Sequence, residues 1–129
     1  MHFRLEDAPR ATLAFRFTAD ERLMLGGLLL PGERPLAVLR WGVARLARTW
    51  VATSRRILFL ERSDRVYRVD DLPYTRLDTL RAFHEPQGSR IRLLAGRITH
   101  GLDGLPGQAV RRFEAAVRGR VAERGLRFA

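Results

Sequence analysis

The chain has 129 residues, which is the length of one domain and enough to bury a core without disulfides. It contains no cysteine, so disulfides and thiolate chemistry are excluded. The net charge is +10 and every basic side chain is arginine. GC-rich coding, which replaces lysine with arginine, is the main expected cause of this composition. An anionic partner, for example phospholipid, nucleic acid or an acidic protein, is a compatible functional explanation.

The longest apolar run, residues 23–30, is much shorter than the roughly 20 residues that span a bilayer. It also lies behind charged residues, unlike the apolar part of a signal peptide. We therefore expect a soluble cytoplasmic protein.

The first 28 residues are expected to form an N-terminal extension with one short helix. Alternating apolar residues suggest strand-like pieces that are buried against the sheet or a second subunit: Phe3, Leu5, Leu13, Phe15 and Phe17. Thr18 and Glu21 have the spacing of a capping box, which predicts a helix from there towards Leu30. Apolar residues lie nearly all round this helix, so we expect it to be buried or half-buried. Pro31 and Gly32 end it.

Seven short strands are predicted after the helix. The central pair is a hairpin over residues 50–61, where two β-favouring apolar runs flank the polar residues 53–56. The strands are expected at residues 36–41, 50–52, 57–61, 65–69, 74–83, 90–94 and 97–100. The connections between them are expected to include residues 42–48, a break at Asp70 and Asp71, a polar loop over 84–89 and a glycine-rich loop over 101–107.

The last predicted element is an amphipathic helix that begins near Gln108. Its apolar residues recur at helical spacing on one stripe: Val110, Phe113, Val117 and Val121. Gly125 would end it. Evenly spaced short strands followed by one such helix indicate a mainly β domain, either a small barrel or a sandwich, with the helix closing an open end.

Three segments resemble bacterial pleckstrin-homology-like (PH-like) domains of the YokE-like type. They are Leu-Pro-Gly-Glu at residues 30–33, Trp-Val-Ala-Thr-Ser-Arg-Arg-Ile-Leu-Phe at 50–59, and Leu-Pro-Tyr-Thr-Arg-Leu at 72–77. The resemblance covers about residues 29–124, and the terminal helix matches in position. It implies a seven-stranded, strongly bent barrel capped by one helix, without catalysis. We therefore expect the PH-like domain to occupy residues 29–129.

No residue constellation predicts an enzyme. Without lysine there is no P-loop or Schiff-base residue, and the histidines His2, His84 and His100 are scattered. His100 and Asp103 have a spacing that suits metal ligands, but it is a common one in glycine-rich loops. We expect no catalytic residue, no metal site and no cofactor.

The arginines are concentrated between Glu33 and Glu61, an interval without any acidic residue. In PH domains that bind phosphoinositides, the connection between the first two strands supplies basic residues, and the resemblance places that connection at residues 42–49. Arginine suits phosphate because its planar guanidinium donates two parallel hydrogen bonds. The anion-binding candidates are Arg40, Arg45, Arg48, Arg55 and Arg56.

Two classes of function stay open. The first is a non-enzymatic protein-interaction or scaffold module that binds a protein partner or itself through sheet edges or its termini, where Phe3, Phe15, Phe17 and Phe128 would contribute. The second is weak binding of an anionic phospholipid through the arginine-rich face, which would hold the protein at the inner face of the membrane. Nucleic acid is a less favoured polyanion, because Trp41 and Trp50 are expected in the core and not on a stacking surface.

Overall fold

The computed structural model describes residues 17–123 and residue 125. The elements follow one another as α1 (Ala19–Leu28), β1 (Pro35–Val43), β2 (Leu46–Thr53), β3 (Arg56–Ser63), β4 (Val66–Pro73), the 3-10 turn η3 (Tyr74–Arg76), β5 (Thr79–Glu85), β6 (Gly88–Ala95), β7 (Ile98–Leu105) and α2 (Gly107–Glu123). This order confirms a mainly β fold with a C-terminal helix and a short helix near the N-terminus.

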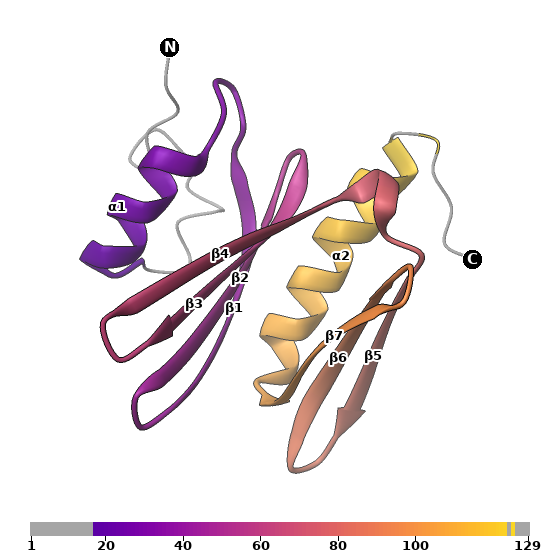
Figure 1. The fold of residues 1–129 in the computed structure, drawn as a ribbon. Coiled ribbons are helices and arrows are strands. Elements are labelled where there is room, and N and C mark those ends of the chain that lie inside the picture. Colours follow the sequence, from indigo (N-terminus) through magenta and orange to yellow (C-terminus); the bar gives the residue numbers. More distant parts are fainter. Residues whose placement is uncertain (1–16, 124, 126–129) are drawn as a thin grey trace.

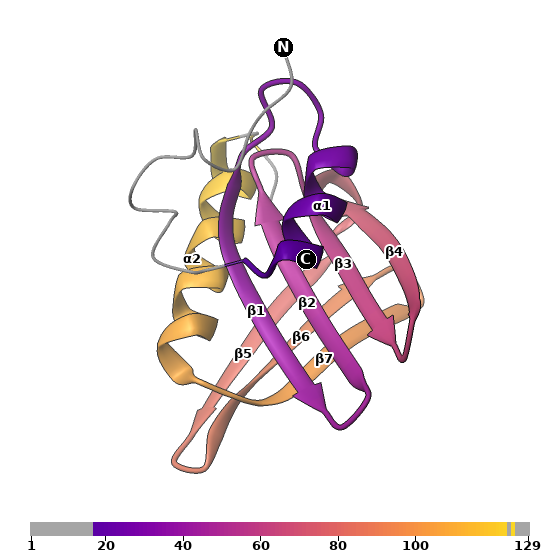
Figure 2. The ribbon, with the colours of Figure 1, turned by 90° about the vertical axis from the view of Figure 1, so that its left-hand side faces the viewer.

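The seven strands form two antiparallel sheets. One has the order β1-β2-β3-β4 and the other β5-β6-β7. Within the described residues no strand of one sheet pairs with a strand of the other, so the sheets do not join into a closed barrel. The strands of the two sheets cross where the sheets face each other (Figure 2), and α2 lies beside them on the side that faces away from α1 (Figure 1).

Side-chain alternation in the four-stranded sheet separates two apolar clusters. On the inner face, Leu39, Trp50 and Ile57 belong to the main core, which β5–β7 and α2 complete. On the outer face, Val51 and Leu58 pack with Leu25 of α1 in a second cluster. Because neighbours in a strand point to opposite faces, a nearly continuous apolar run can supply both clusters at once. The predicted hairpin over residues 50–61 is confirmed, and it lies at the centre of this sheet.

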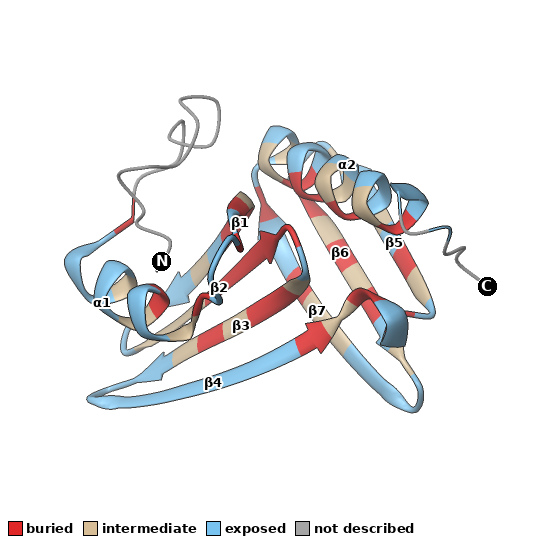
Figure 3. Cartoon of the chain, turned by 90° about the horizontal axis from the view of Figure 1, so that it is seen from above, coloured by how far each residue is buried: buried red, intermediate tan, exposed pale blue. Residues whose placement is uncertain are grey.

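Helix α2 closes one side of the space between the sheets. The four predicted stripe residues are each at most 4% exposed, as expected: Val110, Phe113, Val117 and Val121. The other faces of α2 are mostly exposed or half-buried (Figure 3). Burying three valines and a phenylalanine contributes roughly 1.5–3 kcal/mol of transfer free energy per side chain before entropy costs, which makes this stripe a major part of the core.

Helix α1 begins with the predicted capping box. The Thr18 hydroxyl accepts from the Glu21 N–H at 3.1 Å, and the Glu21 carboxylate accepts from the Thr18 N–H at 2.7 Å. The helix is half-buried, one of the two predicted outcomes. Leu25 is fully buried, but Leu23 is 80% exposed, because the helix lies on one face of a sheet and nothing in the described part of the chain covers its other side.

Several predicted connections are strand in the structure. The first hairpin pairs Val43 with Leu46, which leaves a turn of only two residues, so the expected connection over residues 42–49 is wrong and Arg48 lies inside β2. Asp70 and Asp71 continue β4, where β3 supplies the pairing that their weak strand propensity does not predict.

The second sheet contains the remaining differences. Residues 74–76 form η3 and not the start of a strand, because the Tyr74 hydroxyl is anchored to the Thr53 carbonyl at 2.6 Å. Strand β7 continues to Leu105 through the expected glycine-rich loop, since pairing with β6 supports its backbone. Phe17 is buried. The other apolar residues predicted at the two ends, residues 3–15 and Phe128, lie outside the described residues.

Candidate functional site

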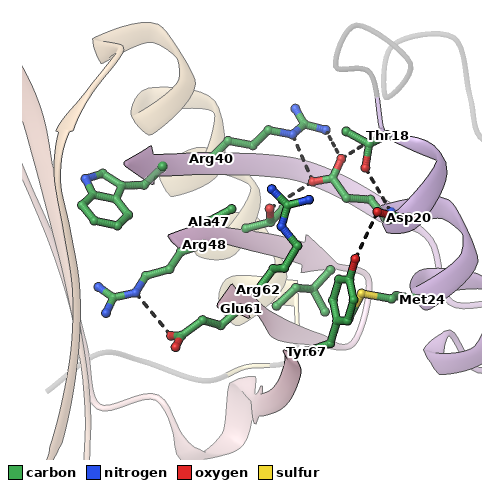
Figure 4. Close-up of a pocket in the computed structure, with 14 residues that line it drawn as sticks. Thr18, Asp20, Met24, Arg40, Ala47, Arg48, Glu61, Arg62 and Tyr67 are labelled. Atoms are coloured by element: carbon green, nitrogen blue, oxygen red, sulfur yellow. Dashed lines mark hydrogen bonds and ion pairs between the residues drawn. The ribbon is translucent and has the colours of Figure 1, made fainter. Parts of the chain in front are cut away.

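A cavity of about 310 Å³ lies between α1 and the outer face of the four-stranded sheet. Apolar residues, among them Met24 and Leu60, contribute to its lining together with residues of β1 and β2. Three arginines also line it: Arg40, Arg48 and Arg62 (Figure 4). Two of the five anion-binding candidates predicted from the sequence, Arg40 and Arg48, therefore line one cavity in the structure.

Arg40 is held by Glu21 of the capping box. Its Nη2 donates to Glu21 Oε1 at 3.0 Å and its Nε to Oε2 at 3.2 Å, while the Thr49 hydroxyl also donates to Oε2 at 3.0 Å. Burial raises the pKa of Glu21, but the hydrogen bonds from Arg40, the Thr18 N–H and Thr49, with the Arg40 charge, outweigh burial and leave that pKa below its ordinary value. Glu21 is therefore ionised at neutral pH and offsets the charge of Arg40.

Arg48 and Arg62 differ in their partners. Arg48 Nε lies 3.3 Å from Glu61 Oε2, and its guanidinium lies over the Trp41 ring at 5.2 Å from the ring centre. Arg62 is exposed and forms no ion pair with another residue of the described segment. Arg62 is not among the candidates predicted from the sequence, because it follows Glu61 and lies just outside the acid-free interval. Strand alternation could have identified Arg62, because it places this residue on the same face as Leu58 and Leu60.

Arg56 is part of a buried ion-pair network at the far end of the sheet. Its Nε donates to Glu33 Oε2 at 3.0 Å, its Nη2 to Glu33 Oε1 at 3.1 Å and to the Leu28 carbonyl at 2.7 Å, and its Nη1 to Asp71 at 3.2 Å. Glu33 is completely buried and accepts further hydrogen bonds from the Thr53 hydroxyl at 2.6 Å and the Leu30 N–H at 3.0 Å. The network ties the segment after α1 to the β2–β3 hairpin and to β4.

The remaining two candidates lie at opposite ends of the sheet. Arg45 is in the β1–β2 turn with its side chain 85% exposed, and its Nε lies 3.6 Å from Asp64. Arg55 is in the β2–β3 turn, exposed, and donates to the Pro31 carbonyl at 3.5 Å. Of the five candidates only Arg40 and Arg48 line the same cavity, and strand alternation directs their side chains to opposite faces of the sheet. Four of the five candidates form an ion pair with a carboxylate that lies outside the acid-free interval or at its boundary. These pairs are Arg40–Glu21, Arg45–Asp64, Arg48–Glu61 and Arg56–Glu33.

Strand β4 is one edge of the four-stranded sheet, and β1, the other edge, contacts α2 and β7. Its residues 66–71 are all exposed, and they include Val66 at 62%, Tyr67 at 43% and Val69 at 42% (Figure 3). Tyr67 donates to Asp20 of α1 at 3.0 Å. Arg68 and Asp70 of this strand form no ion pair within the described residues. An edge strand presents unpaired backbone N–H and C=O groups, so β4 combines apolar side chains with open hydrogen-bonding capacity.

His100 lies in an open cleft of about 590 Å³ between the two sheets. Its ring stacks on Phe59 with centres 4.3 Å apart. Burial lowers the pKa of His100, and the charge of Asp70 only partly opposes that effect. Asp103, which the sequence paired with His100 by spacing, is instead bound to Arg92 at 2.6 Å. Among residues 17–123 and 125, no group of three or more His, Asp or Glu side chains is placed to hold a metal ion.

Neither helix of the described chain has the length and apolar character needed to cross a membrane. No family model and no curated protein matches the sequence. The structure is similar to the crystal structure of a DUF1696 family protein with a pleckstrin-homology domain from Shewanella loihica PV-4, with a TM-score of 0.58, 15% identity, and coverage of 81% of this chain and 97% of that chain. At this identity the likeness shows the fold alone, and the fold is PH-like.

Proposed function

We propose that the chain is a non-enzymatic PH-like protein-interaction module whose contact surface is the free edge of β4. The observation that carries the proposal is the exposure of residues 66–71 along this edge, with Val66, Tyr67 and Val69 accessible to a partner. A peptide or a second strand that pairs with such an edge gains backbone hydrogen bonds and side-chain contacts together. We also propose that the chain is a bacterial, YokE-like PH-like protein. Residues 1–28 would form its N-terminal extension and residues 29–129 its PH-like domain.

The distribution of charge favours a protein partner over a polyanion. Arg40, Arg48 and Arg56 each have a carboxylate within 3.3 Å, so a phosphate would have to displace an existing partner. The β4 edge has mixed charge and exposed apolar side chains, which suits another protein better than a nucleic-acid backbone.

Site-specific photocrosslinking tests the interaction surface. A benzophenone amino acid at Val69 should form crosslinked products in the native cells, whereas the same group at Arg112, on the exposed side of α2, should not. The captured protein is then identified by mass and reconstituted from purified components. Equal labelling from both positions, or none from Val69, would contradict the proposed surface.

Weak binding of anionic phospholipid is the second candidate. It is favoured by the cavity under α1, where Arg62, without an acidic partner in the described residues, lies beside an apolar lining that includes Met24 and Leu60. A headgroup phosphate would contact Arg62 and then Arg40, which strand alternation places on the same face of the sheet, with acyl carbons against the lining. Arg45 and Arg55 would add charge only at the ends of the sheet. This function would place the protein at the inner face of the membrane.

Vesicle sedimentation separates the two candidates. For lipid binding, vesicles of phosphatidylglycerol should retain the protein at low salt and lose it at about 1 M salt, where the Debye length is about 3 Å. R62E should abolish retention, while R112E, the same charge change on α2, should not. Retention that is equal for both variants would remove the cavity from the lipid hypothesis. Capture of an oligonucleotide in place of vesicles would point to nucleic acid.

A further inference from the structure

We infer that the partner of the β4 edge is a second copy of this chain, which pairs β4 antiparallel with β4 about a two-fold axis at Val69. The inference rests on the proposed function and names its partner. It follows from the order of charges along the strand, Arg68-Val69-Asp70, which is complementary to itself when the strand is reversed.

Strand geometry restricts the possible registers. In an antiparallel pair, directly opposite side chains lie on the same face of the sheet. A two-fold axis that relates two copies of one strand must therefore pass through a position where a residue lies opposite its own copy. With the axis at Val69, Arg68 lies opposite Asp70 of the second copy, and Asp70 lies opposite Arg68 of the second copy. Directly opposite side chains are about 4.5–5.5 Å apart at Cβ, close enough for two symmetric ion pairs.

The two neighbouring registers are both unfavourable. With the axis at Arg68, two guanidinium groups lie opposite each other, and with the axis at Asp70, two carboxylates do. Like charges directly opposite destabilise strand pairing. Only the register at Val69 joins opposite charges over the central part of the strand. Neither Arg68 nor Asp70 gives up an ion pair within the described residues to form these contacts.

The same register places apolar groups together. Val69, 42% exposed, meets Val69 of the second copy on the outer face. Val66, 62% exposed, lies opposite Leu72 of the second copy on the inner face; Leu72 is only 5% exposed, so Val69 supplies the main apolar contact. Each four-stranded sheet would then be half of one continuous sheet across the dimer. Because a single strand pair buries little surface, we expect a weak dimer that forms at high protein concentration.

Charges on an edge strand can also serve to prevent pairing. That alternative predicts that removing or reversing the charges promotes self-association. Self-complementary pairing predicts the opposite, so charge reversal distinguishes the two explanations.

Sedimentation equilibrium of the full chain tests the dimer. We expect the mass to rise from 14.8 kDa towards twice that value with concentration. R68D and D70R should each weaken the dimer about tenfold or more, because each places like charges opposite each other. The double variant R68D/D70R should restore it, and an equimolar mixture of the two single variants should form a mixed dimer. R112D, a matched change on α2, should leave the dimer unchanged.

Disulfide trapping tests the register without charge changes. Because the chain has no cysteine, V69C provides a single thiol. Opposite residues have Cα atoms about 4.5–5.5 Å apart, within the range of a disulfide, so V69C should form a covalent dimer under mild oxidation. V66C, on the same edge, should not, since Val66 lies far from its own copy in this register.

The outcomes separate this inference from the proposed function. A chain that stays monomeric at about 1 mM, or a dimer that is insensitive to R68D and D70R, overturns the inference. Crosslinks from Val69 to a different protein would then still support β4 as an interaction surface. Circular dichroism checks that each variant is folded, and restoration in the double variant and in the mixture cannot arise from unfolding.

Discussion

Replacing Glu33 should destabilise the protein strongly, although Glu33 lies outside any proposed contact surface. Its two oxygens accept from Arg56, the Thr53 hydroxyl and the Leu30 N–H, all at 2.6–3.1 Å, and the side chain is completely buried. E33Q keeps the shape but replaces one acceptor oxygen with an amide donor, which would face other donors. Arg56 would lose its buried counter-charge.

The expected loss is about 3 kcal/mol of the free energy of unfolding. Removing one partner of a buried ion pair costs about 3–5 kcal/mol. The lower end applies because Arg56 keeps Asp71, at 3.2 Å, and the Leu28 carbonyl, at 2.7 Å. With a urea dependence of about 2 kcal/mol per molar, the unfolding midpoint of E33Q should fall by about 1.5 M. R55A, at the exposed neighbouring arginine, should change stability by less than about 0.5 kcal/mol.

The effect of E33Q should also depend on pH. Burial raises the pKa of Glu33, but the hydrogen bonds from Arg56, Leu30 and Thr53 and the Arg56 charge leave it below its ordinary value of 4.5. A carboxyl group with a depressed folded-state pKa contributes stability that is present above the unfolded-state pKa and is lost as the pH falls through the folded-state pKa. The difference between wild type and E33Q should therefore be constant above about pH 5 and shrink below pH 4.5. Equal midpoints at pH 7, or a difference that persists unchanged under acid conditions, would refute this account of the network.

Three further changes test the fold. T18A removes the hydroxyl that accepts from the Glu21 N–H, so it should cost about 1 kcal/mol and speed amide exchange in the first turn of α1; unchanged exchange there would argue against the cap. F113A empties a fully buried site in the α2 stripe and should cost about 3–5 kcal/mol in urea unfolding, compared with almost nothing for R112A on the exposed side. G88A should lower the free energy of unfolding by about 2 kcal/mol, because Gly88 has φ +140° and a Cβ there would lie 3.0 Å from Gly104 Cα. G119A, in open space within α2, should instead raise it by about 0.5–1 kcal/mol. Urea midpoints in the reverse order would contradict the close approach of Gly88 to Gly104.

The predicted features that are confirmed depend on neighbours in the sequence. The capping box needs only Thr18 and Glu21, three residues apart, and the α2 stripe needs only helical periodicity over residues 110–121. The central hairpin is visible because strong β-formers flank a short polar step. Connections were predicted less well, since a strand such as β7 can include glycines and polar residues when a paired neighbour supports it.

The proposed sites depend on contacts that span long distances in the sequence. The sequence separates the arginines from acidic residues, whereas folding brings Glu21 to Arg40 and Asp71 to Arg56. Charge along the chain therefore overstates the positive potential on the surface. Exposure of β4 is likewise invisible in its sequence, because an edge strand differs from a central one only in what lies beside it.

Local composition and periodicity were sufficient to predict a mainly β domain with a short capped helix and a terminal amphipathic helix, because propensity and side-chain period are properties of adjacent residues. The PH-like assignment came from the resemblance of residues 30–33, 50–59 and 72–77 to a known family. Tertiary structure decided which arginines are paired, where the cavity under α1 opens, and that β4 is left as a free edge. These features arise from the pairing and packing of distant segments, and their free energies depend on separations that a linear sequence does not contain.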